Sequence, residues 1–136
     1  MTKWAHSLIR LSKYEVETLQ KRLAEVSARR ASAEMRLAVL DAEHEVERER
    51  AAGDAYAAMQ MAAYVQGWRL RRAAAQSTLE EASAEEAGAR DALAQAFEEQ
   101  KKFEHVAELS RLSEKAKVAR IETAQLDETA LRRATR

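Results

Sequence analysis

The sequence predicts an all-α protein, a long antiparallel two-helix coiled coil (helical hairpin), on three observations. Proline is absent and glycine occurs only three times in 136 residues. Alanine, glutamate, arginine, leucine and lysine make up 85 of these residues, a composition typical of coiled coils and long helices. Apolar residues also recur at alternating spacings of three and four over several heptads. Sandwiches, barrels and α/β domains are excluded, because they need many turns.

We expect one coiled-coil domain over residues 1–136, with the first helix at about 4–52. Between Ile9 and Leu40, eight of the ten heptad core positions are apolar. The apolar pattern weakens after Leu40, where charged residues dominate, and we expect the helix to continue there with weaker packing. His44 falls on a core position and is interpreted as a weakly packed seam residue rather than a metal ligand.

The chain reversal is expected within residues 53–67. Gly53 suits the left-handed position that ends many helices, and Asp54 can cap the next helix. Gly67 is a second possible break, and the Ala-rich stretch between these glycines is either helical or a loose connection. With a reversal centred near residue 60, position i would face about 120−i, and residues beyond about 117 would overhang without a partner.

The second helix is expected at about 68–134. Its core spacing is regular from Leu79 to Ala96 and is resumed from Leu112 onward. Between these stretches, four apolar residues follow one another in steps of three: Phe103, Val106, Leu109 and Leu112. Such steps indicate either a stammer in the coiled coil or an apolar face that turns toward a different neighbour, and both interpretations stay open.

The residues that usually support catalysis or metal binding are missing or scattered. Cysteine is absent, so there is no disulfide framework and no thiolate metal site. The three histidines lie at positions 6, 44 and 105, too far apart to share one helical turn, and the isolated glycines form no phosphate-binding loop. We therefore expect no enzymatic activity, no cofactor and no metal ion.

The charge distribution favours a protein partner. The formal net charge is zero, but residues 54–100 carry −4 and residues 101–136 carry +3. Nucleic-acid binding would call for a clearly basic face, so we expect no nucleic-acid partner. The chain has no apolar run long enough for a transmembrane segment or a signal peptide, which predicts a cytoplasmic location.

Three segments resemble the FliJ family of the bacterial flagellar type III export apparatus. They are SLIRLSKYEV at 7–16, AFEEQKKFE at 96–104 and AQLDETALRR at 124–133. The resemblance implies a non-enzymatic hairpin, similar to the stalk of rotary ATPases, that inserts into the hexameric export ATPase and promotes its assembly and activity. It also implies contacts with the cytoplasmic domain of the export gate and with export chaperones, and a peripheral position at the inner face of the cell membrane.

The resemblance assigns two candidate surfaces. The helix ends, together with the expected overhang, would enter the ATPase ring through Trp4, Leu8, Ile9, Ile121, Leu126, Leu131, Arg132 and Arg133. The two arginines also suit the negative end of a helix dipole. Some relatives carry gate-binding aromatics late in the first helix, where this chain has Glu43 and Glu47. The aromatic residues that would take their place here are Tyr56, Tyr64 and Trp68. Neither Trp4 nor Trp68 falls cleanly on a core position of the heptad register.

The alternative is a self-associating coiled-coil scaffold or adaptor unrelated to export. Arg30 in a core position disfavours a parallel homodimer, because two arginines would face each other in a low dielectric. A measured mass separates the two hypotheses: a monomer favours the stalk, and a tight parallel dimer favours the scaffold.

Overall fold

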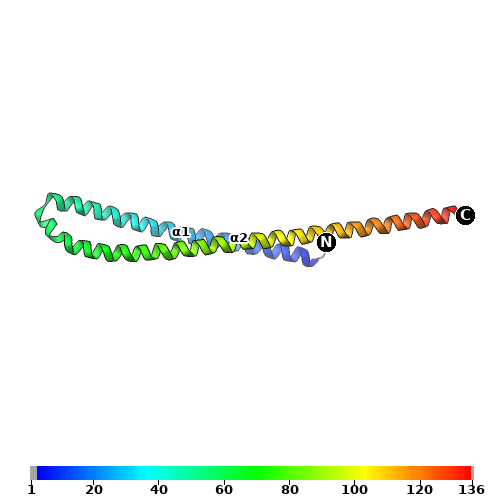
Figure 1. Ribbon diagram of the computed structural model, residues 1–136, viewed down its shortest axis with the longest axis horizontal. Helices are drawn as coiled ribbons and strands as arrows, with labels where there is room; N and C mark the ends of the chain where they lie inside the picture. The colour runs from blue at the N-terminus through cyan, green and yellow to red at the C-terminus, as the bar shows by residue number, and fades with distance from the viewer. Residues whose placement is uncertain (1–2, 136) are drawn as a thin grey trace. The chain divides into compact units, whose positions relative to one another are not determined.

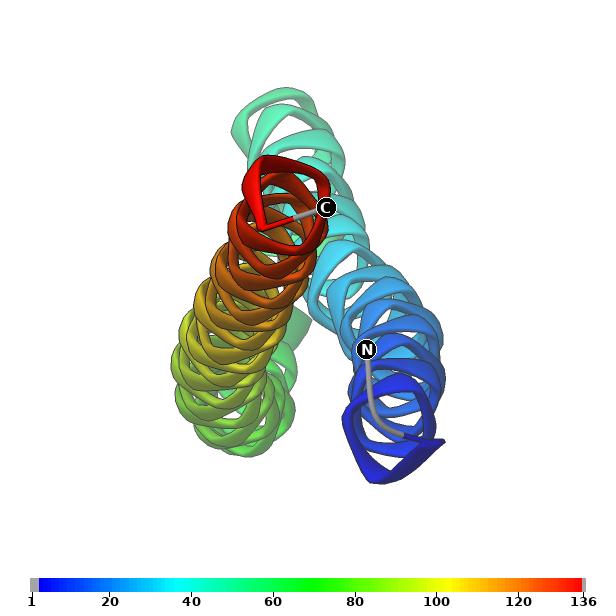
Figure 2. The ribbon, with the colours of Figure 1, turned by 90° about the vertical axis from the view of Figure 1, so that its right-hand side faces the viewer.

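The computed structural model describes residues 3–135, which form two α-helices, α1 (Lys3–Gly53) and α2 (Ala55–Ala134) (Figure 1). The helices run in opposite directions and pack against each other as a helical hairpin, which confirms the predicted fold class. Seen end-on, the described residues show two helices and no third element beside them (Figure 2). Burial therefore comes from helix-on-helix contact alone.

The chain divides into two compact units. The turn unit is Thr18–Leu93, and the terminal unit combines α1 up to Glu17 with α2 from Ala94 onward. In an antiparallel hairpin, a residue of one helix contacts only those residues of the other helix that lie directly beside it. A long hairpin therefore lacks the contacts between distant parts of the chain that a globular core provides.

The buried side of α1 is the heptad seam that the sequence predicts. Every predicted core position from Ile9 to Ala51 is buried or half-buried. Leu40 and Val26 are the most deeply buried large side chains, at 0% and 1% exposure. The seam also continues past Leu40 through His44, Glu47 and Ala51, all half-buried. The expectation that the helix continues through this charged stretch is therefore confirmed.

Asp54 alone separates the two helices. Its Oδ1 accepts a hydrogen bond from the Tyr56 backbone N–H at 3.0 Å, and its carbonyl oxygen accepts one from Ala58 N–H, also at 3.0 Å. This is the capping role that the sequence predicts for Asp54. The left-handed role predicted for Gly53 is wrong, because no described glycine has a positive φ. Residues 55–67, including Gly67, are helical rather than part of a loose connection.

The early reversal shifts the pairing between the helices. Asp41 forms an ion pair with Arg72, whereas a reversal centred near residue 60 would place it opposite residue 79. Arg30 pairs with Glu86 rather than with a residue near 90. The assumed centre is wrong because the cap on Asp54 starts α2 at once, so each residue of α1 meets an earlier part of α2.

The seam of α2 keeps an unbroken heptad spacing from Met61 to Ser110. All of its positions are buried or half-buried: Met61, Val65, Trp68, Arg72, Ala75, Leu79, Ala82, Glu86, Ala89, Leu93, Ala96, Gln100, Phe103, Ala107 and Ser110. Trp68 thus occupies a seam position, contrary to the sequence prediction. The seam passes through 103–110 without a stammer, because Ala107 and Ser110 continue it while Val106 and Leu109 are exposed.

Candidate functional site

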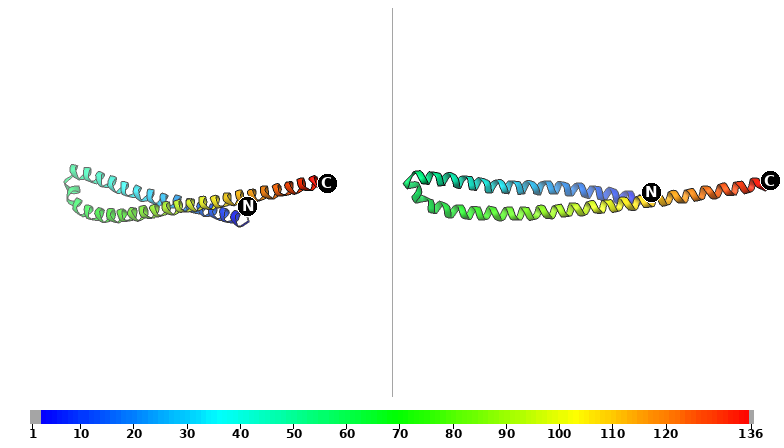
Figure 3. Two further views of the ribbon diagram at one scale, coloured as in Figure 1. Left: turned by 45° about the vertical axis from the view of Figure 1, so that its right-hand side comes forward. Right: turned by 45° about the horizontal axis from the view of Figure 1, so that its top comes forward.

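The C-terminal part of α2 overhangs in the terminal unit. Every residue from 111 to 135 is exposed, and Ala107 is the last buried one. Two views show this part of α2 continuing beyond the beginning of α1 (Figure 3). The sequence predicts an overhang only from about residue 117. It begins six residues earlier because the reversal lies at Asp54.

Apolar residues lie on two opposite sides of this overhang. One line continues the seam spacing and includes Ile121 and Leu131, exposed by 58% and 67%. The other, which we call the outer stripe, consists of Leu109, Leu112, Ala116, Ala119, Thr123, Leu126 and Ala130. The outer stripe occupies heptad positions on the far side of α2 from the seam. Of the two interpretations of residues 103–112, the structure therefore supports a second apolar face.

The candidate ring-binding residues all belong to the terminal unit, but they differ in exposure. Trp4 is 53% exposed, whereas Leu8 and Ile9 are half-buried. Ile9 occupies a seam position, so most of its side chain packs against α2 and is not accessible to a partner. Arg132 donates a hydrogen bond to Glu128 at 2.7 Å, and Arg133 is exposed. Trp4 and the overhang are thus the most accessible of these candidates.

The candidate gate-binding aromatics belong to the turn unit, where two of them meet His44. The His44 ring stacks on Trp68 at 4.1 Å between centroids and lies nearly parallel to Tyr64 at 6.1 Å. Trp68 Nε1–H donates a hydrogen bond to the Leu40 carbonyl oxygen at 2.8 Å. Tyr56 is 69% exposed. His44 consequently packs against two aromatic rings of α2, a contact that sequence reasoning missed.

Two polar atoms of this cluster are buried. His44 Nδ1 and the Tyr64 hydroxyl are buried, and neither has a hydrogen-bond partner among the described residues. Arg71 and Arg72 lie 5.9 Å from the Tyr64 and Trp68 ring centroids, respectively. Buried polar groups usually have a hydrogen-bond partner, so these two atoms are exceptions among the described side chains.

A shallow groove on α1 was also missed. It is lined by Val39, Ala42, Glu43, Val46 and Glu47. Val39 and Val46 are exposed although they are apolar. The signal in the sequence was a second apolar row outside the seam, at the helical spacing of three and four. Here an apolar row lies beside Glu43 and Glu47 on the surface of α1.

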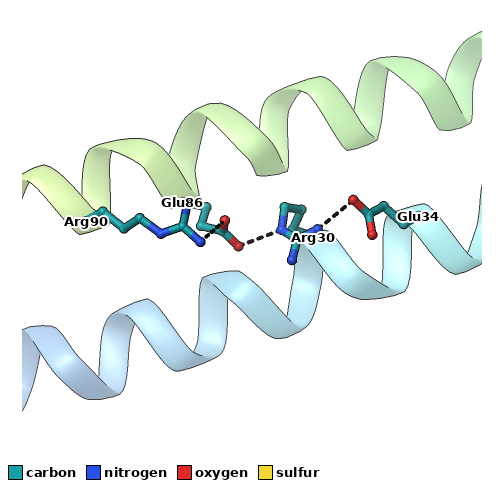
Figure 4. Close-up of polar contacts among 4 residues, drawn as sticks. All are labelled: Arg30, Glu34, Glu86 and Arg90. Carbon is teal, nitrogen blue, oxygen red and sulfur yellow. Dashed lines mark hydrogen bonds and ion pairs between the residues drawn. The ribbon is translucent and has the colours of Figure 1, made fainter.

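A polar network crosses the seam of the turn unit (Figure 4). Arg30 Nε donates a hydrogen bond to Glu86 Oε2 at 2.7 Å, and Arg30 also pairs with Glu34 at 2.6 Å. Glu86 pairs with Arg90 at 2.8 Å, and its side chain is 5% exposed. The hydrogen bond from Arg30 is the main reason that the pKa of Glu86 lies below its ordinary value. This network joins α1 and α2 across the seam at one level of the turn unit.

Three further properties of residues 3–135 concern metal ligation, surface grooves and membrane spans. Within residues 3–135, no three His, Cys, Asp or Glu side chains are grouped so that they could hold a metal ion. The described grooves are open on the helix surfaces. Neither helix contains, over its described length, a stretch apolar and long enough to cross a membrane.

Comparisons with known proteins agree with this description. The family model described as "Flagellar FliJ protein" matches residues 6–136. Two curated relatives named "Flagellar FliJ protein", from Caulobacter vibrioides strains NA1000 / CB15N and ATCC 19089 / CIP 103742 / CB 15, are each 54% identical over 134 residues. Each alignment covers 98% of this chain and 96% of the relative. No solved structure matches the chain.

Proposed function

The chain belongs to the flagellar FliJ family, and on that premise we propose that it is a stalk-like, non-enzymatic component of the bacterial flagellar type III export apparatus. Its overhang inserts into the hexameric export ATPase and promotes ring assembly and activity. The turn unit contacts the cytoplasmic domain of the export gate, and the protein escorts export chaperones. It works in the cytoplasm, peripherally at the inner face of the cell membrane.

The observation that carries ring insertion is the exposed overhang at residues 111–135. Its apolar residues lie on two opposite sides, with Ile121 and Leu131 on one and Leu126 on the other. A helix that lies on a flat surface needs only one apolar side. A helix surrounded by subunits can bury both, so the two-sided pattern supports insertion into a ring.

The gate contact is supported by exposed apolar and aromatic groups in the turn unit. Tyr56 is exposed, and the cluster of His44, Tyr64 and Trp68 has buried polar atoms without partners among residues 3–135. The groove at Val39 and Val46 adds an apolar surface flanked by glutamates. Exposed apolar patches rimmed by polar residues are typical of protein–protein contacts.

The mechanism is coupling rather than chemistry. A single stalk inside a ring of six subunits presents a different side to each subunit. The stalk can shift the conformational equilibrium of a subunit only by the difference between its binding free energies for the two conformations. The alternative, a scaffold unrelated to export, has no support from the family to which the chain belongs.

The decisive experiment measures ATPase activity with a shortened chain. Truncation after residue 116 removes most of the overhang and leaves the seam up to Ser110 intact. We expect the shortened protein to remain helical by circular dichroism and to lose stimulation of the purified export ATPase. Unchanged stimulation would show that the overhang is not the inserted segment.

Matched point variants test the same surface without deletion. Leu126 and Leu70 are exposed by 70% and 75%, but they lie in the terminal and the turn unit, respectively. Leu126→Asp should weaken binding to the ATPase by about tenfold or more, because burying a leucine contributes roughly 1.5–3 kcal/mol. Leu70→Asp should stimulate like the unchanged protein.

A further inference from the structure

The outer stripe has the pattern of a second coiled-coil seam that none of residues 3–135 covers. Its residues keep the spacing of three and four from Leu109 to Ala130. Leu109, Leu112 and Leu126 are exposed by 53%, 48% and 70%. A heptad stripe of this length indicates a partner helix that runs alongside it. Because the stripe faces away from the seam, such a helix would not displace α1.

The flanking charges argue against a parallel pair of overhangs. In a parallel coiled coil, the residue just before the first core position of each heptad, here before Ala116 and Thr123, faces the residue five places later on the other helix. This rule brings Lys115 opposite Arg120 and Glu122 opposite Asp127. Twofold symmetry doubles each like-charge contact. A parallel dimer through the outer stripe is therefore disfavoured.

The same flanks are complementary when the second copy runs antiparallel. Pairing Leu109 with Leu126 of the second copy also pairs Leu112 with Thr123, and Ala116 with Ala119. In this register Lys115 lies beside Glu122 of the second copy, and symmetry repeats the contact. Shifting the register by one heptad either way brings two Lys115 or two Glu122 side chains together. The charges thus select a single self-complementary register.

We propose that the free protein forms an antiparallel homodimer through the outer stripes of two overhangs. The occupant is a second copy of this chain, because one sequence supplies both members of each pair in a closed twofold arrangement. The dimer covers the leucines that solvent would otherwise contact. Its formation is a property of the chain by itself and does not depend on the export ATPase.

Charge reversal tests the proposal, with sedimentation equilibrium of the full chain as the measurement. Lys115→Glu and Glu122→Lys each turn two attractive contacts into two repulsive ones. We expect each to weaken dimerisation by about tenfold or more. The double variant restores attraction and should dimerise like the unchanged chain. Lys117→Glu makes the same charge change on the other side of α2 and should have little effect.

Two results would overturn the proposal. One is a full chain that stays monomeric up to several hundred micromolar. The other is a dimer that either single reversal tightens, because both reversals turn a repulsive contact of the parallel pair into an attractive one. Leu126→Ser provides a second check: it should reduce dimerisation while helicity, followed by circular dichroism, stays unchanged. Leu70→Ser in the turn unit is its control.

Discussion

At the scale of single residues, Arg30 and Glu86 show how a polar pair can occupy an apolar seam. A buried charge is costly unless it is paired and hydrogen-bonded. Each of these two has more than one partner, since Arg30 also contacts Glu34 and Glu86 also contacts Arg90. The pair thus satisfies its charges with groups that lie close by on the same two helices.

Glu86→Gln should lower the melting temperature, because Arg30 then loses its charged partner within the seam. The matched control is Glu85→Gln, which breaks the neighbouring pair with Arg29. That pair is longer, at 3.4 Å, and both side chains are about half exposed. Thermal unfolding followed by circular dichroism should show a clearly larger fall for Glu86→Gln than for its control.

Replacing both members of the pair gives the opposite test. Arg30→Met combined with Glu86→Leu removes the charges together and leaves no unpaired group. Such replacements are often neutral or stabilising. The double variant should melt at or above the temperature of the unchanged protein. A double variant that melts below Glu86→Gln would contradict this account of the seam.

At the scale of elements, a single capping residue, Asp54, joins the two helices. The Asp54 side chain satisfies a backbone N–H in the first turn of α2. Asp54→Ala should destabilise the hairpin by about 0.5–2 kcal/mol, the usual effect of losing a helix cap. Asp54→Asn keeps an acceptor oxygen and should change stability much less. Urea unfolding of the three proteins provides the comparison.

Gly53 gives the complementary result. It ends α1 without a positive φ, and a Cβ atom added there would meet no atom within 4 Å. Gly53→Ala should therefore stabilise the protein by up to about 1 kcal/mol, since alanine is the better helix former. A left-handed Gly53 would give destabilisation instead, so the sign of the change distinguishes the two geometries.

Along α2, the apolar pattern changes sides near Leu109. The seam ends at Ser110, while the outer stripe begins one residue earlier and continues to Ala130. In sequence this change looks like consecutive steps of three, which is also the pattern of a stammer. Burial distinguishes the cases, because Ala107 is buried whereas Val106 and Leu109 are exposed. The spacing alone could not, since alanine and serine give a weak apolar signal.

At the scale of the whole molecule, ion pairs between and along the helices link stability to pH. Hydrogen bonds from Arg72, Arg30 and Arg111 lower the pKa values of Asp41, Glu86 and Glu108 below their ordinary values of 3.8, 4.5 and 4.5. A carboxyl group with a lowered pKa in the folded state stabilises the fold above its unfolded pKa. That stability is lost as the pH falls through the folded-state pKa.

The melting temperature should therefore stay nearly constant from pH 7 to about pH 5 and fall as the pH is lowered from there to 3. Circular dichroism melts across this range provide the test. Glu86→Gln removes one of the contributing carboxyl groups and should melt with a shallower dependence on pH. An equal or steeper dependence in this variant would contradict the assigned contribution of Glu86.

The sequence by itself determined the fold class, the seam of α1 and the family. Composition and heptad spacing are local properties, and helices form from local hydrogen bonds, so Val16, Val26 and Leu40 could be assigned to the core without knowing their partners. The segments at 7–16, 96–104 and 124–133 likewise carried the family resemblance, which the family match confirms.

Only the tertiary structure decided which levels of the two helices meet. The register depends on where the reversal lies, and a difference of a few residues there shifts every contact along the hairpin. The ring stack at His44, the Arg30–Glu86 pair and the start of the overhang at residue 111 all follow from Asp54 as the turn. The physical reason is that a heptad pattern indicates which side of a helix is buried. It does not indicate which residues of the other helix that side contacts, because this depends on the position of the turn and on the pairing of the two helices.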